Sequence, residues 1–161
     1  MNARSPAWSW SVRRWSELEV TTAYALLALR AEVFVVEQAC AYLDLDGKDL
    51  HADALHVFAV CDHEGGARIG AYLRVVPPTV SFTEPSLGRV VTAPDARGSG
   101  LGHELVRRGI EALLQRWPGS AIRIGAQAHL ERYYAAHGFV VDSEPYLEDG
   151  IPHIEMLRAA P

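Results

Sequence analysis

The sequence is short of positive charge: its 161 residues include a single lysine, Lys48, and no segment rich in lysine and arginine. The formal net charge is −5. Nucleic-acid binding draws much of its affinity from basic side chains that displace counterions from phosphates, so we expect no nucleic-acid partner. No run approaches the roughly 18 consecutive apolar residues that a membrane-spanning helix needs. We therefore expect no membrane insertion.

Signals for export and for metal binding are also missing. The first residues, Met1 to Trp8, contain no apolar stretch like that of a secretory signal, which predicts a cytoplasmic protein. The two cysteines, Cys40 and Cys61, are then expected to be free thiols. The histidines lack the partners and spacing of a zinc site, and the segment 44–55 lacks the glycine and glutamate positions of a calcium loop. The sequence predicts no metal ion.

The residues that are present predict one domain, 1–161, because no repeat, low-complexity tract or flexible linker divides the chain. Apolar residues at a spacing of two predict strands, and those at helical spacing predict helices. We expect strands over 8–14, 56–61, 68–76, 87–92, 121–125, 139–141 and 154–157, and helices over 23–30, 101–117 and 129–137. This order predicts an α+β fold of three layers, in which helices flank a mixed, mostly antiparallel central sheet.

The first helix and the loop after it carry further expectations. Thr21 or Thr22 is expected to cap the helix, because threonine is a good N-cap residue. The β-branched run 33–36 predicts that the helix ends or tightens near Glu37. The polar, aspartate-rich segment 39–54 is long for a loop in a small domain, which is typical of a functional loop.

A glycine-rich turn precedes the second helix. It consists of Arg97, Gly98, Ser99, Gly100, Leu101, Gly102 and His103. The first turn of a helix has about four unpaired N–H groups and a partial positive charge, and glycines let a phosphate approach them closely. The turn lacks the Gly-Lys-Ser/Thr of a Walker loop and the third glycine of a dinucleotide fingerprint. A phosphate site and a simple connecting turn both remain open on these residues alone.

Two motifs together decide between these alternatives. Arg97, Gly100 and Gly102 match the Arg/Gln-x-x-Gly-x-Gly/Ala motif of the GNAT acetyltransferase superfamily, and 134–139 resembles its Tyr-x-x-x-Gly-Phe segment. More narrowly, the segments 30–38, 125–130 and 148–153 are similar to the ElaA-like branch. The resemblance runs from about Trp8 to Arg158. It implies a GNAT-type acyl-CoA N-acyltransferase fold with acetyl-CoA as cofactor.

The resemblance also implies roles for individual residues. Acetyl-CoA would lie in a wedge between two splayed parallel strands, 87–92 and 121–125, with pantetheine on the backbone near Val90 and Thr92. An N–H around Val90 or Val91 would bind the oxyanion of the tetrahedral intermediate. Tyr134 occupies the position of the family's tyrosine acid, and its neighbour Tyr133 is assigned to packing. Gln127 stands where many relatives have an asparagine that binds the pantetheine arm.

The strand before the glycine turn lacks the glutamate that serves as general base in many relatives, so the resemblance implies a base from elsewhere in the chain. Glu37 and His153 are the candidates, acting directly or through water. Glu37 can instead pair with Arg30 or another cation, and His153 can serve only as a hydrogen-bonding residue of the sheet. The acidic residues of this region either gather around the acceptor pocket and attract an ammonium group or form a solvated surface. They are Glu37, Asp44, Asp46, Asp49, Glu148 and Asp149.

These residues predict an enzyme that moves the acetyl group of acetyl-CoA to a primary amine of a small molecule, peptide or protein. The alternative is a CoA-binding or acyl-CoA-binding sensor or interaction module without catalysis. Transfer of a longer acyl group is a third hypothesis. A homodimer is compatible with the sequence, which does not determine the oligomeric state.

Overall fold

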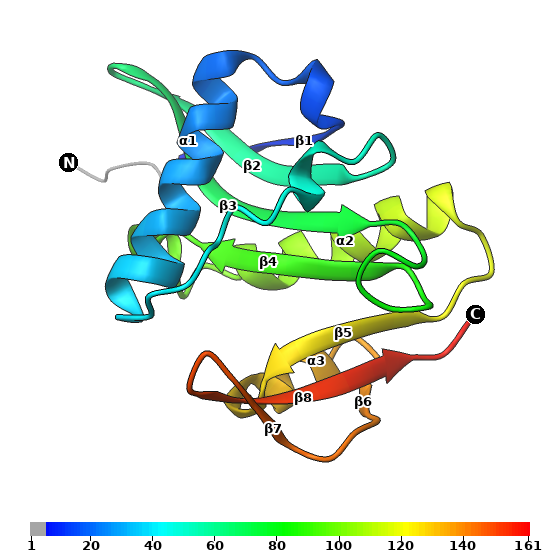
Figure 1. The fold of residues 1–161 in the computed structure, drawn as a ribbon. Coiled ribbons are helices and arrows are strands. Elements are labelled where there is room, and N and C mark those ends of the chain that lie inside the picture. Colours follow the sequence, from blue (N-terminus) through cyan, green and yellow to red (C-terminus); the bar gives the residue numbers. More distant parts are fainter. Residues whose placement is uncertain (1–5) are drawn as a thin grey trace.

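The computed structural model describes residues 6–161, the side chain of His63 excepted. Eight strands and three α-helices form two antiparallel sheets with helices packed on them (Figure 1). In chain order they are β1 (Ser9–Arg13), α1 (Val20–Arg30), β2 (Leu55–His63), β3 (Gly66–Val76), β4 (Ser86–Thr92), α2 (Leu101–Arg116), β5 (Ile122–Gln127), α3 (Glu131–Ala135), β6 (Val140–Val141), β7 (Tyr146–Glu148) and β8 (Ile151–Arg158).

The two sheets meet at β4 and β5. The first has the order β1-β2-β3-β4; in the second, β8 lies between β5 on one side and β6 and β7 on the other. The β4 and β5 strands run side by side in the same direction (Figure 1). Near their starts, the N–H of Arg123 donates to the carbonyl of Pro85 at 3.3 Å, but no ladder joins the two strands. Two strand edges therefore face each other without pairing.

Helices cover both faces of the first sheet, with α1 in front and α2 behind in Figure 1. The α2 helix contacts β2, β3 and β4, because its apolar side chains recur at helical spacing. Gly109 allows this approach: a Cβ atom there would lie 2.6 Å from a methyl group of the buried Leu73. No helix within 6–161 combines the length and apolar character needed to cross a membrane.

Helix α1 differs from the sequence-based expectation at both ends. Glu19 is the N-cap residue, and Thr21 and Thr22 lie inside the helix, so the predicted threonine cap is wrong. The chain stays helical to Glu37, where the sequence predicted that the helix ends or tightens. It does not tighten there, because the segment Ala31–Glu37 forms the wider π-helix. Its bonds span five residues, from the N–H of Gln38 to the carbonyl of Val33 at 3.1 Å. The wide turns bring Glu37 and Gln38 to the cavity described below.

Candidate active site

A cavity of about 1020 Å³ opens between β4 and β5. It extends from the glycine turn at the start of α2 to the loop after the π-helix and the β7–β8 hairpin. Among the residues that the sequence singled out for cofactor binding or catalysis, Ser99 and Leu101 do not line it. The others do: Glu37, Val90, Val91, Thr92, Arg97, Gly98, Gly100, Gly102, His103, Gln127, Tyr134 and His153.

The glycine turn has a backbone that only glycine adopts easily. Gly98 has a φ of 77° and Gly100, the N-cap residue of α2, a φ of 82°. A Cβ atom at either position would meet no heavy atom within 4 Å, so open space lies beside both residues. Ser99 donates its hydroxyl to the carbonyl of Ala96 at 2.7 Å, and the side chain of Leu101 is buried. These last two residues shape the turn, and their side chains do not line the cavity.

Arg97 and Glu37, predicted to serve different ends of the reaction, form an ion pair. One guanidinium nitrogen of Arg97 lies 2.8 Å from the Glu37 carboxylate, and both side chains are more than 40% exposed, at 45% and 42%. Glu37 therefore pairs with a cation, as one alternative predicted, but this cation is not Arg30. A phosphate at the turn would compete with Glu37 for Arg97.

Two histidines lie together beside the glycine turn. The Nδ1 atom of His103 is 2.9 Å from Nε2 of His137, and its ring lies 4.6 Å from that of Tyr133. Burial and the charge of His103 lower the pKa of His137. Burial raises the pKa of Tyr133 to about 12. No local pattern predicts the place of His137 here, because 34 residues separate it from its partner.

Tyr134 is 6% exposed and contacts the cavity from helix α3. Its ring meets those of Tyr133 and Phe139 edge to face, at centroid distances of 5.1 and 6.1 Å. Burial raises the pKa of its hydroxyl, so the group keeps its proton at neutral pH. A protonated hydroxyl at the cavity wall can act as a proton donor.

His153 lies on β8 and stacks on Tyr146, with the ring centroids 5.9 Å apart. Its Nδ1 is 2.7 Å from the carbonyl of Ile151, so the proton of the neutral ring belongs on Nδ1. Nε2 then carries the free lone pair and lies 3.4 Å from the Glu148 carboxylate. Such an imidazole can accept a proton, and the neighbouring carboxylate stabilises the cation that forms.

Gln127, at the end of β5, donates its amide to the side-chain carbonyl of Gln38 at 3.2 Å. Both residues line the cavity, and their bond joins β5 to the end of the π-helix. Gln38 was not predicted as a site residue. It comes from a segment 89 residues earlier in the chain, and the sequence carries no signal for such a pairing.

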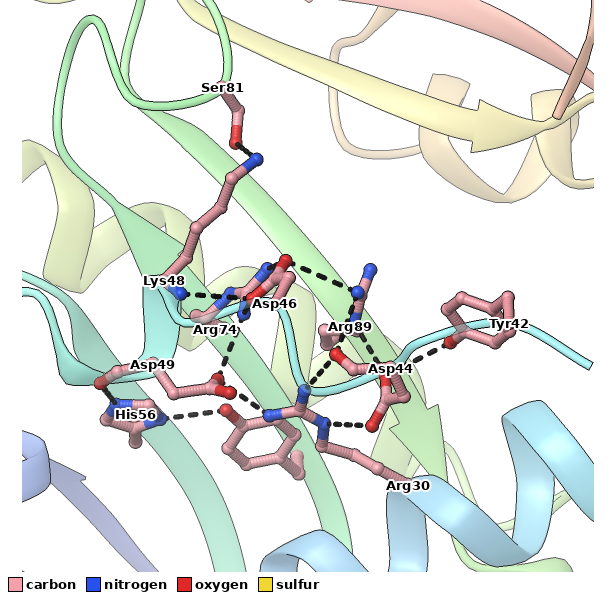
Figure 2. Close-up of polar contacts among 11 residues, drawn as sticks. Arg30, Tyr42, Asp44, Asp46, Lys48, Asp49, His56, Arg74, Ser81 and Arg89 are labelled. Carbon is pink, nitrogen blue, oxygen red and sulfur yellow. Dashed lines mark hydrogen bonds and ion pairs between the residues drawn. The ribbon is translucent and has the colours of Figure 1, made fainter. Parts of the chain in front are cut away.

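Three arginines and three aspartates form a largely buried group, here called the Arg–Asp network (Figure 2). Its members are Arg30, Arg74, Arg89, Asp44, Asp46 and Asp49. Arg30 of α1 has no exposed surface and reaches Asp44 at 2.9 Å and Asp49 at 2.7 Å. Arg74 of β3 lies 2.7 Å from Asp46 and 3.0 Å from Asp49. Both predicted roles of these aspartates, attraction of an ammonium group and a solvated surface, are therefore wrong, because buried arginines neutralise them.

The network favours the ionised forms of Asp46 and Asp49. Burial opposes ionisation of Asp46, but the hydrogen bonds and charge of Arg74, together with Arg89, lower its pKa to about 2. Burial likewise opposes ionisation of Asp49, but the hydrogen bonds and charges of Arg30 and Arg74 lower its pKa. Both side chains are acceptors for buried donors, and protonation would remove part of that bonding.

Acidification is therefore expected to destabilise the fold through these carboxylates. A group whose folded pKa lies below its unfolded value contributes stability that is complete above about pH 4. This stability is lost as the pH falls from about 4 to about 2. Urea denaturation should show a steeper fall of the unfolding free energy in this range for the wild type than for Asp46→Asn, which cannot titrate. Equal slopes for the two proteins would contradict the role of Asp46.

Comparisons with known proteins bear on this site. Residues 65–159 match the model of the acetyltransferase (GNAT) domain. Protein ElaA of Escherichia coli K12 is 40% identical over 149 residues, which are 92% of this chain and 95% of ElaA. The crystal structure of E. coli ElaA has a TM-score of 0.86 at 38% identity, covering 94% of this chain and 99% of that one.

A further crystal structure, of an acyl-CoA N-acyltransferase from Pseudomonas aeruginosa, has a TM-score of 0.87 at 44% identity. It covers 95% of this chain and 100% of that one. Both structural likenesses extend over nearly the whole chain, sheets and helices included. The predicted fold class is therefore confirmed.

Proposed function

Because the chain belongs to the GNAT acetyltransferase family and is an acyltransferase, we propose that it transfers the acetyl group of acetyl-CoA to a primary amine. The observation that carries the proposal is the cavity between β4 and β5, which ends at the glycine turn. A wedge between unpaired strand edges suits a thin amide-containing arm, and a helix N-terminus suits a phosphate. One ligand with both parts is coenzyme A.

In this proposal the turn from Arg97 to His103 binds the diphosphate. The N–H groups at the start of α2 have no partners within the helix, and the glycine positions 98 and 100 leave space for the ligand. Arg97 would exchange Glu37 for the phosphate, which takes two charge-assisted hydrogen bonds from one guanidinium. The edge of β4 near Val90 and Thr92, together with Gln127, would bind the pantetheine arm.

The reaction then proceeds by direct attack of the amine on the thioester carbonyl. We take His153 as the base, because its Nε2 lone pair lies at the acceptor end of the cavity, whereas Glu37 lies beside Arg97 at the glycine turn, where the diphosphate would bind. The N–H of Val90 or Val91 would stabilise the oxyanion. As the intermediate collapses, the C–S bond breaks and Tyr134 gives its proton to the sulfur. The products are the N-acetylated amine and free coenzyme A.

The acceptor side of the cavity supports an amine that carries positive charge before it is deprotonated. Glu148 and Asp149 line the cavity there and, among the described residues, no arginine or lysine pairs with either in an ion pair. The wall on the other side, including Asp46, belongs to the Arg–Asp network and is neutralised. A small amine or a peptide amine fits this proposal equally well.

Binding of coenzyme A is the direct test of the proposed site. Gly100→Val is expected to weaken coenzyme A binding by about 10-fold to 100-fold, because it loses one charged hydrogen bond of about 1.5–3 kcal/mol. Gly119→Val is the matched control: Gly119 has a similar φ of 74° and equally open surroundings, but it lies in the turn after α2, away from the cavity. Isothermal titration calorimetry measures both dissociation constants.

The outcomes separate the hypotheses. If the wild type produces no heat with coenzyme A, or if the two valine variants bind it equally, the proposed site is wrong. If the wild type binds coenzyme A but releases no thiol from acetyl-CoA with any of a panel of amines, the non-catalytic sensor replaces the enzyme.

A further inference from the structure

Strand β4 is irregular where it borders the cavity. Tyr72 of β3 pairs with Val91, and Arg74 pairs with Gly88, so Arg89 and Val90 together face the single residue between those two on β3. This is a β-bulge, which interrupts the ladder and turns backbone groups out of it. Arg89 has a φ of 53°, a left-handed conformation that residues other than glycine adopt infrequently. Something beyond local preference must hold it.

The side chain of Arg89 reaches the loop that follows the π-helix. Its Nε lies 2.7 Å from an Asp44 carboxylate oxygen, and one terminal nitrogen donates to the carbonyl of Asp44 at 3.0 Å. The same nitrogen lies 3.3 Å from the Asp46 carboxylate. The ring of Tyr42 covers the guanidinium at 5.5 Å, and its hydroxyl donates to Asp44 at 3.0 Å. Tyr42, Asp44 and Asp46 thus hold the bulge from outside β4, and their contacts with Arg89 are here called the clamp.

The clamp itself is fixed to the core. Arg30 holds Asp44 from helix α1, and Arg74 holds Asp46 from strand β3, the neighbour of β4 (Figure 2). Arg30 is fully buried and Arg74 nearly so. The loop from Tyr42 to Asp49 therefore cannot shift without breaking buried ion pairs. Arg89 links the bulge to a rigid frame.

We propose that Arg89 is a positioning residue, which holds the β4 bulge in its left-handed conformation and so aims the backbone N–H groups of Val90 and Val91 at the reacting carbonyl. The inference rests on the proposed function, because it assigns those N–H groups to the oxyanion. Arg89 itself need not touch the substrate. Its effect passes through the backbone that it constrains.

The test compares two truncations that remove the same ion pairs. Arg89→Ala deletes the clamp and favours a backbone with negative φ, whereas Arg89→Gly deletes the clamp but accepts the left-handed conformation. We expect kcat to fall about 10-fold or more in Arg89→Ala, a part of the 10²–10³-fold cost of a lost oxyanion donor. Arg89→Gly should stay within about threefold of the wild type, because its backbone tolerates the bulge. KM for acetyl-CoA should change much less than kcat in Arg89→Ala, because Thr92, Gln127 and the glycine turn still bind the cofactor.

Arg116→Ala is the control for loss of an arginine, since Arg116 pairs with Asp53 on the surface, away from the cavity. It should retain wild-type kcat. If Arg89→Ala does not fold, Arg89→Gln and Arg89→Asn replace the pair, and the asparagine variant should be the more active because asparagine enters the left-handed region more readily. Thiol release with the best acceptor of an amine panel gives the rates.

Three results would overturn the inference. Equal losses of kcat in the alanine and glycine variants would mean that the lost charge, not the backbone, matters. A higher KM for the amine at unchanged kcat would make Arg89 an acceptor-binding residue. Wild-type kcat in Arg89→Ala would remove any role. If the wild type itself shows no thiol release with any amine, the proposed function is wrong. This measurement precedes the variants, so the two failures can be told apart.

Discussion

Replacing Tyr134 with phenylalanine should lower kcat by about 10²–10⁴-fold and leave the affinity for coenzyme A unchanged. The change removes only the hydroxyl group of Tyr134, which burial keeps protonated at neutral pH by raising its pKa. A phenol is a weaker acid than a free thiol in water, so the transfer needs an aligned contact.

Tyr133→Phe is the matched control for this change. Tyr133 is the preceding residue on α3, also lines the cavity and also has a pKa raised by burial, to about 12. Its loss should lower kcat by much less than the loss of Tyr134. Steady-state kinetics gives kcat, and calorimetry gives the affinity for coenzyme A. If Tyr133→Phe is the inactive variant, the acid has been assigned to the wrong tyrosine.

Replacing Arg30 with methionine should lower the free energy of unfolding by about 3–5 kcal/mol, because each of two buried carboxylates loses one of its arginine partners. Arg30 has no exposed surface and donates to Asp44 and Asp49, each under 10% exposed. Methionine keeps much of the side-chain volume, so the loss measures the missing charge and hydrogen bonds. Urea denaturation monitored by circular dichroism gives the value.

Arg116→Met serves as the surface counterpart. Arg116 and Asp53 are 2.7 Å apart, as close as the buried pairs, but both side chains are more than 40% exposed. An exposed ion pair contributes about 0–1 kcal/mol, so this variant should lose little stability. Similar losses for the two variants would show that burial does not set the strength of the Arg–Asp network.

Regular spacing made most of the fold predictable. The apolar residues of α2 recur at helical spacing and predicted its bounds within one residue, at 101–117 against Leu101–Arg116. The place of the glycine turn was also predictable: it precedes the helix, and Arg97, Gly98, Gly100, Gly102 and His103 line the end of the cavity. Both features depend on neighbours in sequence.

Features that depend on distant partners were not predictable. The contacts of Arg30 and Arg89 with Asp44 join residues 14 and 45 positions apart, and no local pattern distinguishes these arginines from surface ones. The β7–β8 hairpin was also missed, because Leu147 and Glu148 of β7 are exposed and show no buried alternation. A signal did exist there: Asp149 and Gly150, with φ of 50° and 75°, form the Asp-Gly turn typical of two-residue hairpin loops.

The lack of a ladder between β4 and β5 has a further consequence for how the two sheets move. Ladders of backbone hydrogen bonds resist bending within each sheet, whereas β4 and β5 are joined by isolated contacts, among them the Arg123–Pro85 bond, the Arg123–Glu84 ion pair and, through the π-helix, the Gln127–Gln38 bond. The gap between β4 and β5 can then change its width to fit a ligand while the hydrogen-bond ladders of both sheets stay intact. A ligand that contacts both β4 and β5 would restrict this movement, so its binding should slow amide hydrogen exchange in both sheets at once.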